Sequence, residues 1–323
     1  MFNHIKLTRP DLTVPAVNDG RHKLDRANAA DRESIPVLVH LPDEGIALFS
    51  YTWVNSAGEA GAVIFLFGPG VGPEPLVFGM PDRPVPDDMD FSDWKIDSFE
   101  MKQDLKFGTC VTHFANDRVK LDYTFEGSHP PYAYSANAKG CPPYCADDRI
   151  EQSGRAHGVL ELDGRRIEFD TTGHRDHSWG SRDWKAFQTY RWFQGQAGPD
   201  VSVHFWNLNA LGMTSLFGYV FKDGLMAEVT DLKYDLTFGE GFKQKRLTAE
   251  LIDEAGRKTT VEADFYAHAP LIPSPDITLT EAGARALIDG KPGVGWLEVA
   301  MQTEYLEHIR ANPAYLRYAG GDA

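Results

Sequence analysis

Apolar and polar residues alternate with a period of two along most of the chain, which is typical of β-strands with one buried face. Short turns rich in Gly, Asn or Asp separate the alternating runs, as at Asp163-Gly164. The runs that we expect to be strands are 46–53, 62–67, 76–78, 94–99, 119–125, 157–162, 166–169, 189–194, 201–209, 215–221, 225–229, 248–252, 259–267 and 294–304. Many short strands joined by local turns predict an all-β protein of meandering sheets or barrels.

Three segments depart from this period. Residues 1–35 are polar, and we expect an irregular arm or a short helix around Asn28 to Ser34. Residues 304–310 predict a short terminal helix. The segment 128–148 contains four prolines and several tyrosines, including Tyr132 and Tyr134. Loops of this length in compact domains are usually functional, so the segment is either a lid over a ligand or a packed surface loop.

Composition narrows the class of protein. The 323 residues are enough for two domains, and the net charge of -15 disfavours nucleic acid and anionic membranes as partners. No stretch is apolar for the roughly 18 residues of a membrane span, and the first residues do not have the pattern of a secretory signal. Three cysteines fit a reducing compartment, so we expect a cytoplasmic protein in which Cys110, Cys141 and Cys145 are plain thiols.

The segment 173–184 carries the densest candidate chemistry. Its sequence, Gly-His-Arg-Asp-His-Ser-Trp-Gly-Ser-Arg-Asp-Trp, combines two imidazoles, both signs of charge and two indoles. Ionisable groups held among tryptophans are partly removed from water, where their pKa values can be adjusted for catalysis. Dinucleotide-binding, phosphate-binding and nucleophile-elbow glycine motifs are absent from the sequence, which disfavours nucleotide-dependent oxidoreductases, kinases and α/β hydrolases.

The order of these features resembles the carotenoid 1,2-hydratase-like family. The residues that carry the resemblance are Asp176-His177-x-Trp179-Gly180 after a hairpin, the strand from Trp192 with its successor 201–209, and Gly293-x-Gly295-Trp-Leu-Glu298. The resemblance implies two consecutive lipocalin-like β domains, 1–184 with the 128–148 lid and 185–323. It further implies a pocket near their junction for an apolar or aromatic ligand. Members of this family include hydratases of isoprenoid double bonds and cyclases.

Asp176 and His177 are the candidate catalytic residues. Burial among Trp179 and Trp184 would raise the pKa of Asp176, and a nearby Arg175 or Arg182 would lower it, so the sequence leaves acid and base open. His177 suits proton transfer near neutral pH. The alternatives are an Asp176 that pairs with an arginine and a His177 that packs in the interior.

Aromatic and polar residues around these two are the candidate substrate contacts. On the strand 201–209, alternation separates His204 and Trp206 from Asn207 and Asn209, and either face could line a pocket. The full set of candidate contacts is Trp179, Arg182, Trp184, Tyr190, Trp192, His204, Trp206, Asn207, Asn209, Tyr132 and Tyr134. Core packing is the alternative for the aromatics, and an ion pair with Asp183 is the alternative for Arg182. His174, Asp176 and His177 are a possible zinc or iron site, which His204 on a later strand could complete. His177 would converge with the other two only if the chain turned sharply, so we expect neither a metal nor another cofactor.

The sequence therefore predicts a cofactor-independent lyase of hydratase or dehydratase type that acts by acid–base catalysis on a hydrophobic isoprenoid or aromatic molecule. A cyclase or isomerase with the same pocket and a non-catalytic carrier of a lipophilic ligand are the alternatives. The expected partner is a small molecule, and the chain could form a homodimer.

Overall fold

The structure, a computed structural model, describes residues 2–319, and most of these residues lie in β-strands. The chain divides into two units. Unit 1 comprises residues 1–41, 48–66 and 76–182, and unit 2 comprises 42–47, 67–75 and 183–323. Two short segments of the first half of the sequence thus belong to the unit formed mainly by the second half.

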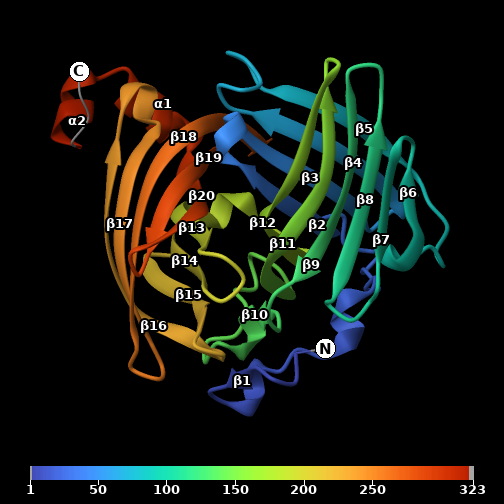
Figure 1. The fold of residues 1–323 in the computed structure, drawn as a ribbon, viewed down its shortest axis with the longest axis horizontal. Coiled ribbons are helices and arrows are strands. Elements are labelled where there is room, and N and C mark those ends of the chain that lie inside the picture. The colour runs from blue at the N-terminus through green and yellow to red at the C-terminus, as the bar shows by residue number, and fades with distance from the viewer. Residues whose placement is uncertain (1, 320–323) are drawn as a thin grey trace. The chain divides into compact units, whose positions relative to one another are not determined.

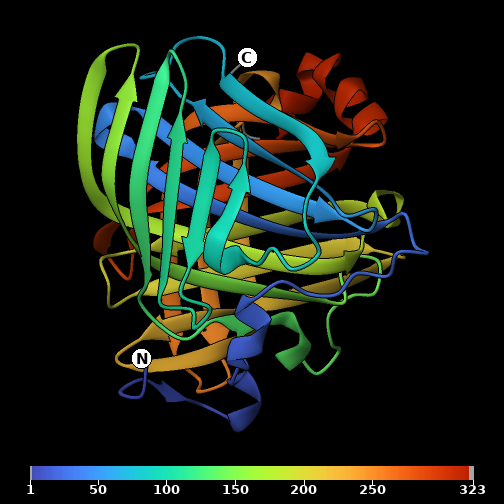
Figure 2. The ribbon, with the colours of Figure 1, turned by 90° about the vertical axis from the view of Figure 1, so that its right-hand side faces the viewer.

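Unit 1 is organised around one antiparallel sheet. The strands of this sheet are β2 (Asp31–Leu41), β3 (Ile46–Asn55), β4 (Glu59–Phe67), β5 (Leu76–Pro84), β6 (Trp94–Ile96), β7 (Phe99–Gln103), β8 (Thr109–Ala115), β9 (Val119–Gly127), β10 (Tyr132–Ala133), β11 (Asp148–Leu162) and β12 (Arg165–Ser181). The short strand β1 (Lys6–Leu7) is not part of it. The sheet order is β5-β4-β3-β2-β12-β11-β9-β8-β7-β6, with β10 beside β11 (Figure 2). β2 and β12, which are distant in sequence, are therefore neighbours.

Unit 2 is a closed barrel. Its elements are β13 (Phe187–Gln196), β14 (Ser202–Ala210), β15 (Met213–Lys222), β16 (Leu225–Phe238), β17 (Gln244–Asp253), β18 (Lys258–Ser274), β19 (Ile277–Ile288), β20 (Lys291–Gln302), α1 (Thr303–Arg310) and α2 (Pro313–Tyr318). The strands run in the order β16-β15-β14-β13-β20-β19-β18-β17, and pairing of β16 with β17 closes the circle (Figure 1). Phe193, Phe205 and Leu297 are fully buried members of its apolar core.

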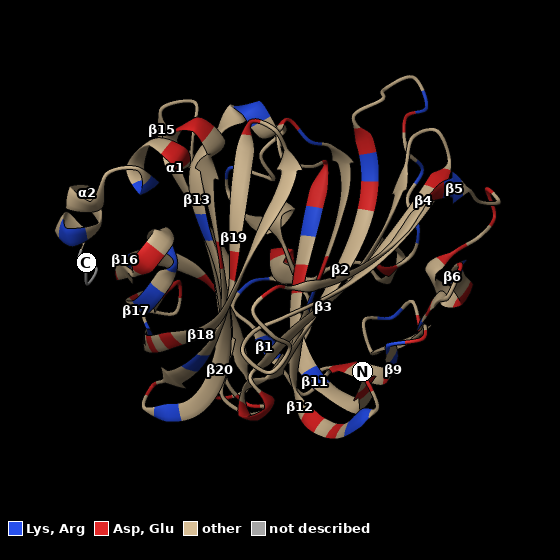
Figure 3. Ribbon diagram, turned by 90° about the horizontal axis from the view of Figure 1, so that it is seen from above, with Lys and Arg blue, Asp and Glu red and all other residues tan. Residues whose placement is uncertain are grey.

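The predicted all-β class is confirmed, and so is the helix at 304–310, which is most of α1. A helix around Asn28–Ser34 is wrong from Asp31 onward, because those residues begin β2. The expected strand 94–99 is two strands, since Asp97 has a φ of 53° and turns the chain between them. No helix among residues 2–319 is long and apolar enough to cross a membrane. Charged residues of both signs are distributed over strands and loops of both units (Figure 3).

The barrel core gives a stability prediction for unit 2. Leu297 is fully buried in that core, so Leu297→Ala should lower the free energy of unfolding by about 2–5 kcal/mol through lost burial and the cavity left behind. Leu287 on the neighbouring strand β19 is 41% exposed, and Leu287→Ala should cost much less. Urea denaturation followed by circular dichroism measures both, and equal losses would contradict this description of the core.

Candidate functional site

The segment 173–181 is a regular part of strand β12 rather than a loop. Side chains alternate across a strand, so His174 and Asp176 lie on one face and His177 and Trp179 on the other. The register agrees, because Asp176 lies opposite Glu151 of β11, whereas His177 lies opposite the apolar Ile150. Each face of β12 therefore has its own cluster of ionisable groups.

The first cluster, which we call the Glu33 cluster, consists of His22, Glu33 and His177. Glu33 lies on β2, the strand next to β12, and its side chain is fully buried. Its Oε1 is 2.7 Å from Nδ1 of His22 and 2.7 Å from Nε2 of His177. The backbone N–H of His22 also donates to Oε2 at 2.9 Å. One buried carboxylate thus accepts hydrogen bonds from two imidazoles and a peptide group.

These hydrogen bonds keep the carboxylate ionised. Burial by itself would raise the pKa of Glu33, but the hydrogen bonds and charges of His177 and His22 outweigh burial and leave that pKa below its ordinary value. Nδ1 of His177 is buried and has no hydrogen-bond partner among the described residues. Because an ionised carboxylate only accepts, Nε2 of His177 carries the proton that is donated to Glu33.

Aromatic rings enclose the Glu33 cluster. The His22 ring stacks on Trp179 with centroids 3.7 Å apart and planes 7° apart. Phe91 meets the His177 ring edge-on at 5.5 Å. Arg21, the residue before His22, anchors this part of the arm. Its Nη1 donates to the carbonyl oxygens of Pro86 and Met89, and its backbone N–H donates to Asp90.

The backbone conformation at position 180 explains why the Asp-His-x-Trp-Gly signature ends in glycine. Its φ is +102°, and a Cβ at this position would lie 2.5 Å from atoms of Asp147. The backbone N–H of Asp147 donates to the carbonyl of Trp179 at 2.8 Å. Any larger residue would displace the segment that supports Trp179.

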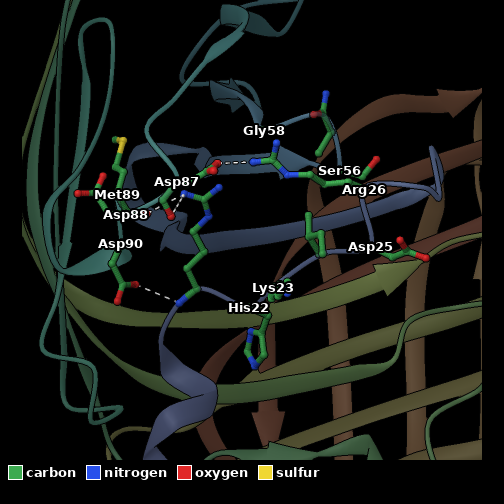
Figure 4. Close-up of a pocket in the computed structure, with 13 residues that line it drawn as sticks. His22, Lys23, Asp25, Arg26, Ser56, Gly58, Asp87, Asp88, Met89 and Asp90 are labelled. Atoms are coloured by element: carbon green, nitrogen blue, oxygen red, sulfur yellow. Dashed lines mark hydrogen bonds and ion pairs between the residues drawn. The ribbon is translucent and has the colours of Figure 1, made fainter.

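A pocket of about 590 Å³ adjoins the Glu33 cluster, and His22 is part of its wall. Most of the lining is polar or charged, with Leu24 and Met89 as apolar members. Figure 4 shows the charged side chains, with Arg26 paired to Asp87 and the ring of His22 projecting from the arm. Nδ1 of His22 is bound to Glu33, and no described residue hydrogen-bonds its Nε2, so Nε2 is the ring nitrogen that has a free hydrogen-bonding position.

The second cluster lies on the other face of β12 and is centred on Arg149 of β11. Arg149 donates from Nη2 to Asp176 at 2.6 Å and from Nε to Glu151 at 2.6 Å. Glu151 is fully buried and also accepts from Tyr134 Oη at 2.9 Å and from His174 Nε2 at 2.8 Å. Burial lowers the pKa of His174 despite its hydrogen bond to Glu151.

Asp176 and His177 are not brought together as one acid–base pair. They point to opposite faces of β12, so a direct proton relay between them has no geometric basis. The arginine beside Asp176 is Arg149, rather than the expected Arg175 or Arg182. Arg175 binds the buried Asp19 at 2.9 Å, and Arg182 donates to the carbonyl of Cys145 and to Ser178 Oγ.

The 128–148 segment is packed into unit 1. Tyr132 and Tyr134 are fully buried, and Tyr134 belongs to the Arg149 cluster through Glu151. Ser135 binds Asp148 through both its backbone N–H and its hydroxyl group. Of the two alternatives, a lid over a ligand and a packed loop, the packed loop agrees with the burial of these tyrosines.

Most of the remaining candidate contacts gather on one face of β13 and β14 in unit 2. Tyr190 packs against Trp206, Trp192 packs against His204, and Tyr190 Oη donates to Glu298. Trp184 is half-buried against Phe187. Asn207 and Asn209 lie half-buried on the other face, where Asn209 accepts from Thr214.

The donor set of the Glu33 cluster could also hold a metal ion. The ligand atoms of His22, Glu33 and His177 lie within 4.8 Å of one another, and two imidazoles with one carboxylate suit zinc or iron. The 2.7 Å contacts are hydrogen-bond lengths, so a metal would have to replace the protons that Glu33 now accepts. The three residues considered as a metal site from the sequence do not converge, because His177 lies on the opposite face of β12 from His174 and Asp176.

The family profile described as a domain of unknown function (DUF7064) matches residues 15–303, most of the chain. The chain belongs to the DUF7064 family. A search of curated proteins gives no match.

Solved structures share the fold of this DUF7064 protein at low sequence identity. A Nitrosomonas europaea protein assigned as AttH has 12% identity and a TM-score of 0.61, and the match covers 91% of this chain and 99% of that one. CghA in complex with Sch210972 has 13% identity and a TM-score of 0.63, with 85% and 89% covered. Kievitone hydratase from Nectria haematococca has 10% identity and a TM-score of 0.58, with 93% and 96% covered. These matches support the expected lipocalin-like architecture.

Sequence reasoning missed His22, Glu33, Arg149 and Glu151. Glu33 could have been noticed, because it is a charged residue just before the mostly apolar run 35–41. The charged residues at the start of β11 gave a similar signal. His22 lies in a polar arm without periodicity, so nothing in the sequence of this DUF7064 protein marked it.

Removing Arg149 should be costly. Arg149→Met leaves Asp176 and Glu151 buried without their cation, and we expect a loss of about 3–5 kcal/mol in the free energy of unfolding. Arg155 on the same strand also pairs with two carboxylates, but its side chain is 50% exposed, and Arg155→Met should cost less than about 1 kcal/mol. Chemical denaturation compares the two, and similar losses would refute the buried network.

The Glu33 cluster should make stability depend on acid pH. Because the folded-state pKa of Glu33 is lowered, the unfolded chain binds more protons, and the stabilisation is lost as pH falls below the ordinary value of 4.5 and through the lower folded value. Glu33→Gln should be less stable at pH 7 and should flatten this part of the stability curve. The exposed Glu74→Gln is the control, and denaturation between pH 7 and pH 3 measures all three proteins. A Glu33→Gln curve parallel to that of the wild type would contradict this account.

Proposed function

We propose that this protein is an acid–base enzyme of hydratase or dehydratase type, with His22 as the proton-transferring group and Glu33 as its orienting carboxylate. The observation that carries the proposal is the hydrogen bond between His22 Nδ1 and Glu33, which leaves Nε2 of a pocket-lining histidine available. A carboxylate on Nδ1 fixes the ring orientation and stabilises the imidazolium that forms when Nε2 accepts a proton.

His177 acts as a positioning residue in this scheme. Its Nε2–H donates to the same Oε1 of Glu33, which fixes the carboxylate from the interior side. Trp179, stacked on His22, restricts the ring to one plane and can favour the protonated ring through its π face. In the direction of water addition, protonated His22 would donate from Nε2 to one carbon of a double bond, and water would attack the other carbon. The extra proton of that water would return to His22 Nε2, which leaves the alcohol and restores the acid. Dehydration would reverse these steps.

The pocket suggests which part of a substrate lies beside His22. Its volume of about 590 Å³ is in the range of small-molecule sites. The charged and polar side chains among its lining residues can hydrogen-bond to hydroxyl or carbonyl oxygens of a substrate. We therefore propose an isoprenoid or aromatic substrate whose oxygen-bearing end occupies this pocket. A structural neighbour named kievitone hydratase supports the hydratase class, although only the fold is shared at 10% identity.

A panel of unsaturated isoprenoid and aromatic compounds, together with the corresponding alcohols, tests the reaction type. The purified protein is incubated with each compound in ¹⁸O-labelled water, and mass spectrometry follows the products. Incorporation of one labelled oxygen into an alkene, or loss of water from an alcohol, is the expected result. A product of unchanged mass would instead indicate a cyclase or isomerase. Binding without any product across the panel would indicate a carrier and overturn the proposal.

Variants of the His22–Glu33 pair then test the roles. On any compound that is turned over, His22→Gln and Glu33→Gln should each lower kcat by about 10²–10⁴-fold with a smaller change in substrate affinity. His113 is a matched control, because its Nδ1 also contacts a carboxylate, Asp122, but on an exposed part of β8. His113→Gln should keep full turnover, and full turnover in His22→Gln would exclude the proposed role.

A further inference from the structure

The apolar core of the unit 2 barrel borders a pocket of about 450 Å³. The pocket wall comes from β13, from the chain at 238–242 and from the junction of β20 with α1 at one end of the barrel (Figure 1). The volume is in the range of small-molecule sites. The apolar side chains that line it belong to Phe238, Phe242, Met301, Tyr305 and Ile309.

One guanidinium group lines this pocket without an anion beside it. Arg191 is half-buried on β13, two residues before the core residue Phe193, so both side chains lie on the inner face of the strand. Nη1 of Arg191 donates to Thr189 Oγ1 at 2.7 Å. Its Nε is buried and has no hydrogen-bond partner, and no carboxylate among residues 2–319 forms an ion pair with this arginine.

Other arginines of the same barrel have anionic partners within the protein. Arg246 binds Glu262 and Asp264, and Arg285 binds Asp43. A cation that is partly removed from water is more stable when an anion accepts its hydrogen bonds. The arrangement at Arg191 therefore leaves a position for an anion that the protein itself does not supply.

A second polar side chain lies beside Arg191. Asn207 of β14 is directly opposite Arg191 in the strand register, so the two side chains share the inner face of the barrel. Asn207 is half-buried, and its side-chain amide makes no hydrogen bond within the described part of the chain. The amide can donate to an oxygen atom that the neighbouring guanidinium holds.

The chemistry of the two donors selects the kind of anion. The planar guanidinium matches the two oxygens of a carboxylate, to which it can donate two parallel hydrogen bonds. A single cation balances a single negative charge, and the net charge of -15 disfavours the approach of molecules that carry several. The aromatic and aliphatic wall suits an apolar body attached to that carboxylate.

We propose that this pocket at the end of the unit 2 barrel binds an amphipathic monocarboxylic acid. Arg191 and Asn207 bind the carboxylate, and Phe238, Phe242 and Met301 contact the apolar body. All five residues belong to unit 2. The proposal concerns a second ligand and does not depend on the activity proposed for the Glu33 cluster.

Calorimetric titration of the full-length protein with octanoate and with 3-phenylpropanoate tests the proposal. We expect saturable binding of at least one of these acids, and the pair distinguishes an aliphatic from an aromatic body. The corresponding alcohols, 1-octanol and 3-phenylpropanol, lack the charge and should bind at least about tenfold more weakly. No saturable binding of either acid at about 1 mM, or equal affinity for acid and alcohol, would overturn the proposal.

A variant of the arginine tests which cation is used. Arg191→Gln should weaken binding of the acid by about tenfold or more, because the charge-assisted hydrogen bonds are lost. Arg246→Gln is the matched control in the same barrel, since Arg246 already binds carboxylates of the protein, and it should bind the acid as the wild type does. Unchanged affinity in a folded Arg191→Gln protein would contradict the proposal.

Photoaffinity labelling of the wild type locates the acid even if a variant does not fold. An octanoate analogue with a terminal diazirine is bound, irradiated and mapped by mass spectrometry. We expect labelled peptides that contain residues 238–242 or 301–309, with labelling suppressed by excess octanoate and unchanged in His22→Gln. Labelling confined to residues 21–26 or 86–90 would place the acid beside His22 and overturn this proposal, while the proposed function would stand.

Discussion

A buried carboxylate is stable as an anion only where donors replace the water it has lost, and this requirement shapes the centre of unit 1. Glu33 meets it with two imidazoles and a peptide N–H. Glu151 meets it with Arg149, Tyr134 and His174. The donors come from the N-terminal arm, the 128–148 segment and strands β11 and β12. Satisfying the two acids therefore ties these distant parts of the sequence to one another.

The carboxylates of Glu33 and Glu151 have different partners on the two faces of strand β12. The Arg149 cluster contains a permanent cation, two carboxylates that bind it and a histidine whose pKa burial keeps low. The Glu33 cluster has no guanidinium bound to its carboxylate among the described hydrogen bonds, and it includes a half-buried histidine at a pocket wall. A group with fixed charge stabilises structure, whereas a group that can gain and lose a proton can take part in a reaction. This difference is the reason why we propose the Glu33 cluster as the site of proton transfer.

Alternation predicted the fold class and many of the strands, because burial of one face gives a local signal that survives in any antiparallel sheet. Strands β2, β8 and β19 were not among the expected runs. It also indicated that His174 and His177 would diverge. The partners of these residues could not be predicted, because β2 and β12 are more than a hundred residues apart in sequence and only their pairing brings Glu33 to His177. His22 was hidden for a second reason. Its position depends on bonds from Arg21 to the carbonyls of residues 86 and 89, which no pattern in the arm reveals.

The division of the chain into units has a practical consequence for dissecting the protein. Unit 2 includes residues 42–47 and 67–75 as well as everything after residue 182. Tyr266 of β18 donates to the carbonyl of Ile46, and Trp296 of β20 packs edge-on against Phe67. A gene fragment starting at residue 183 would encode every strand from β13 to β20 but omit both of these partners. The second half expressed alone would expose a surface that the intact chain covers with its own earlier residues.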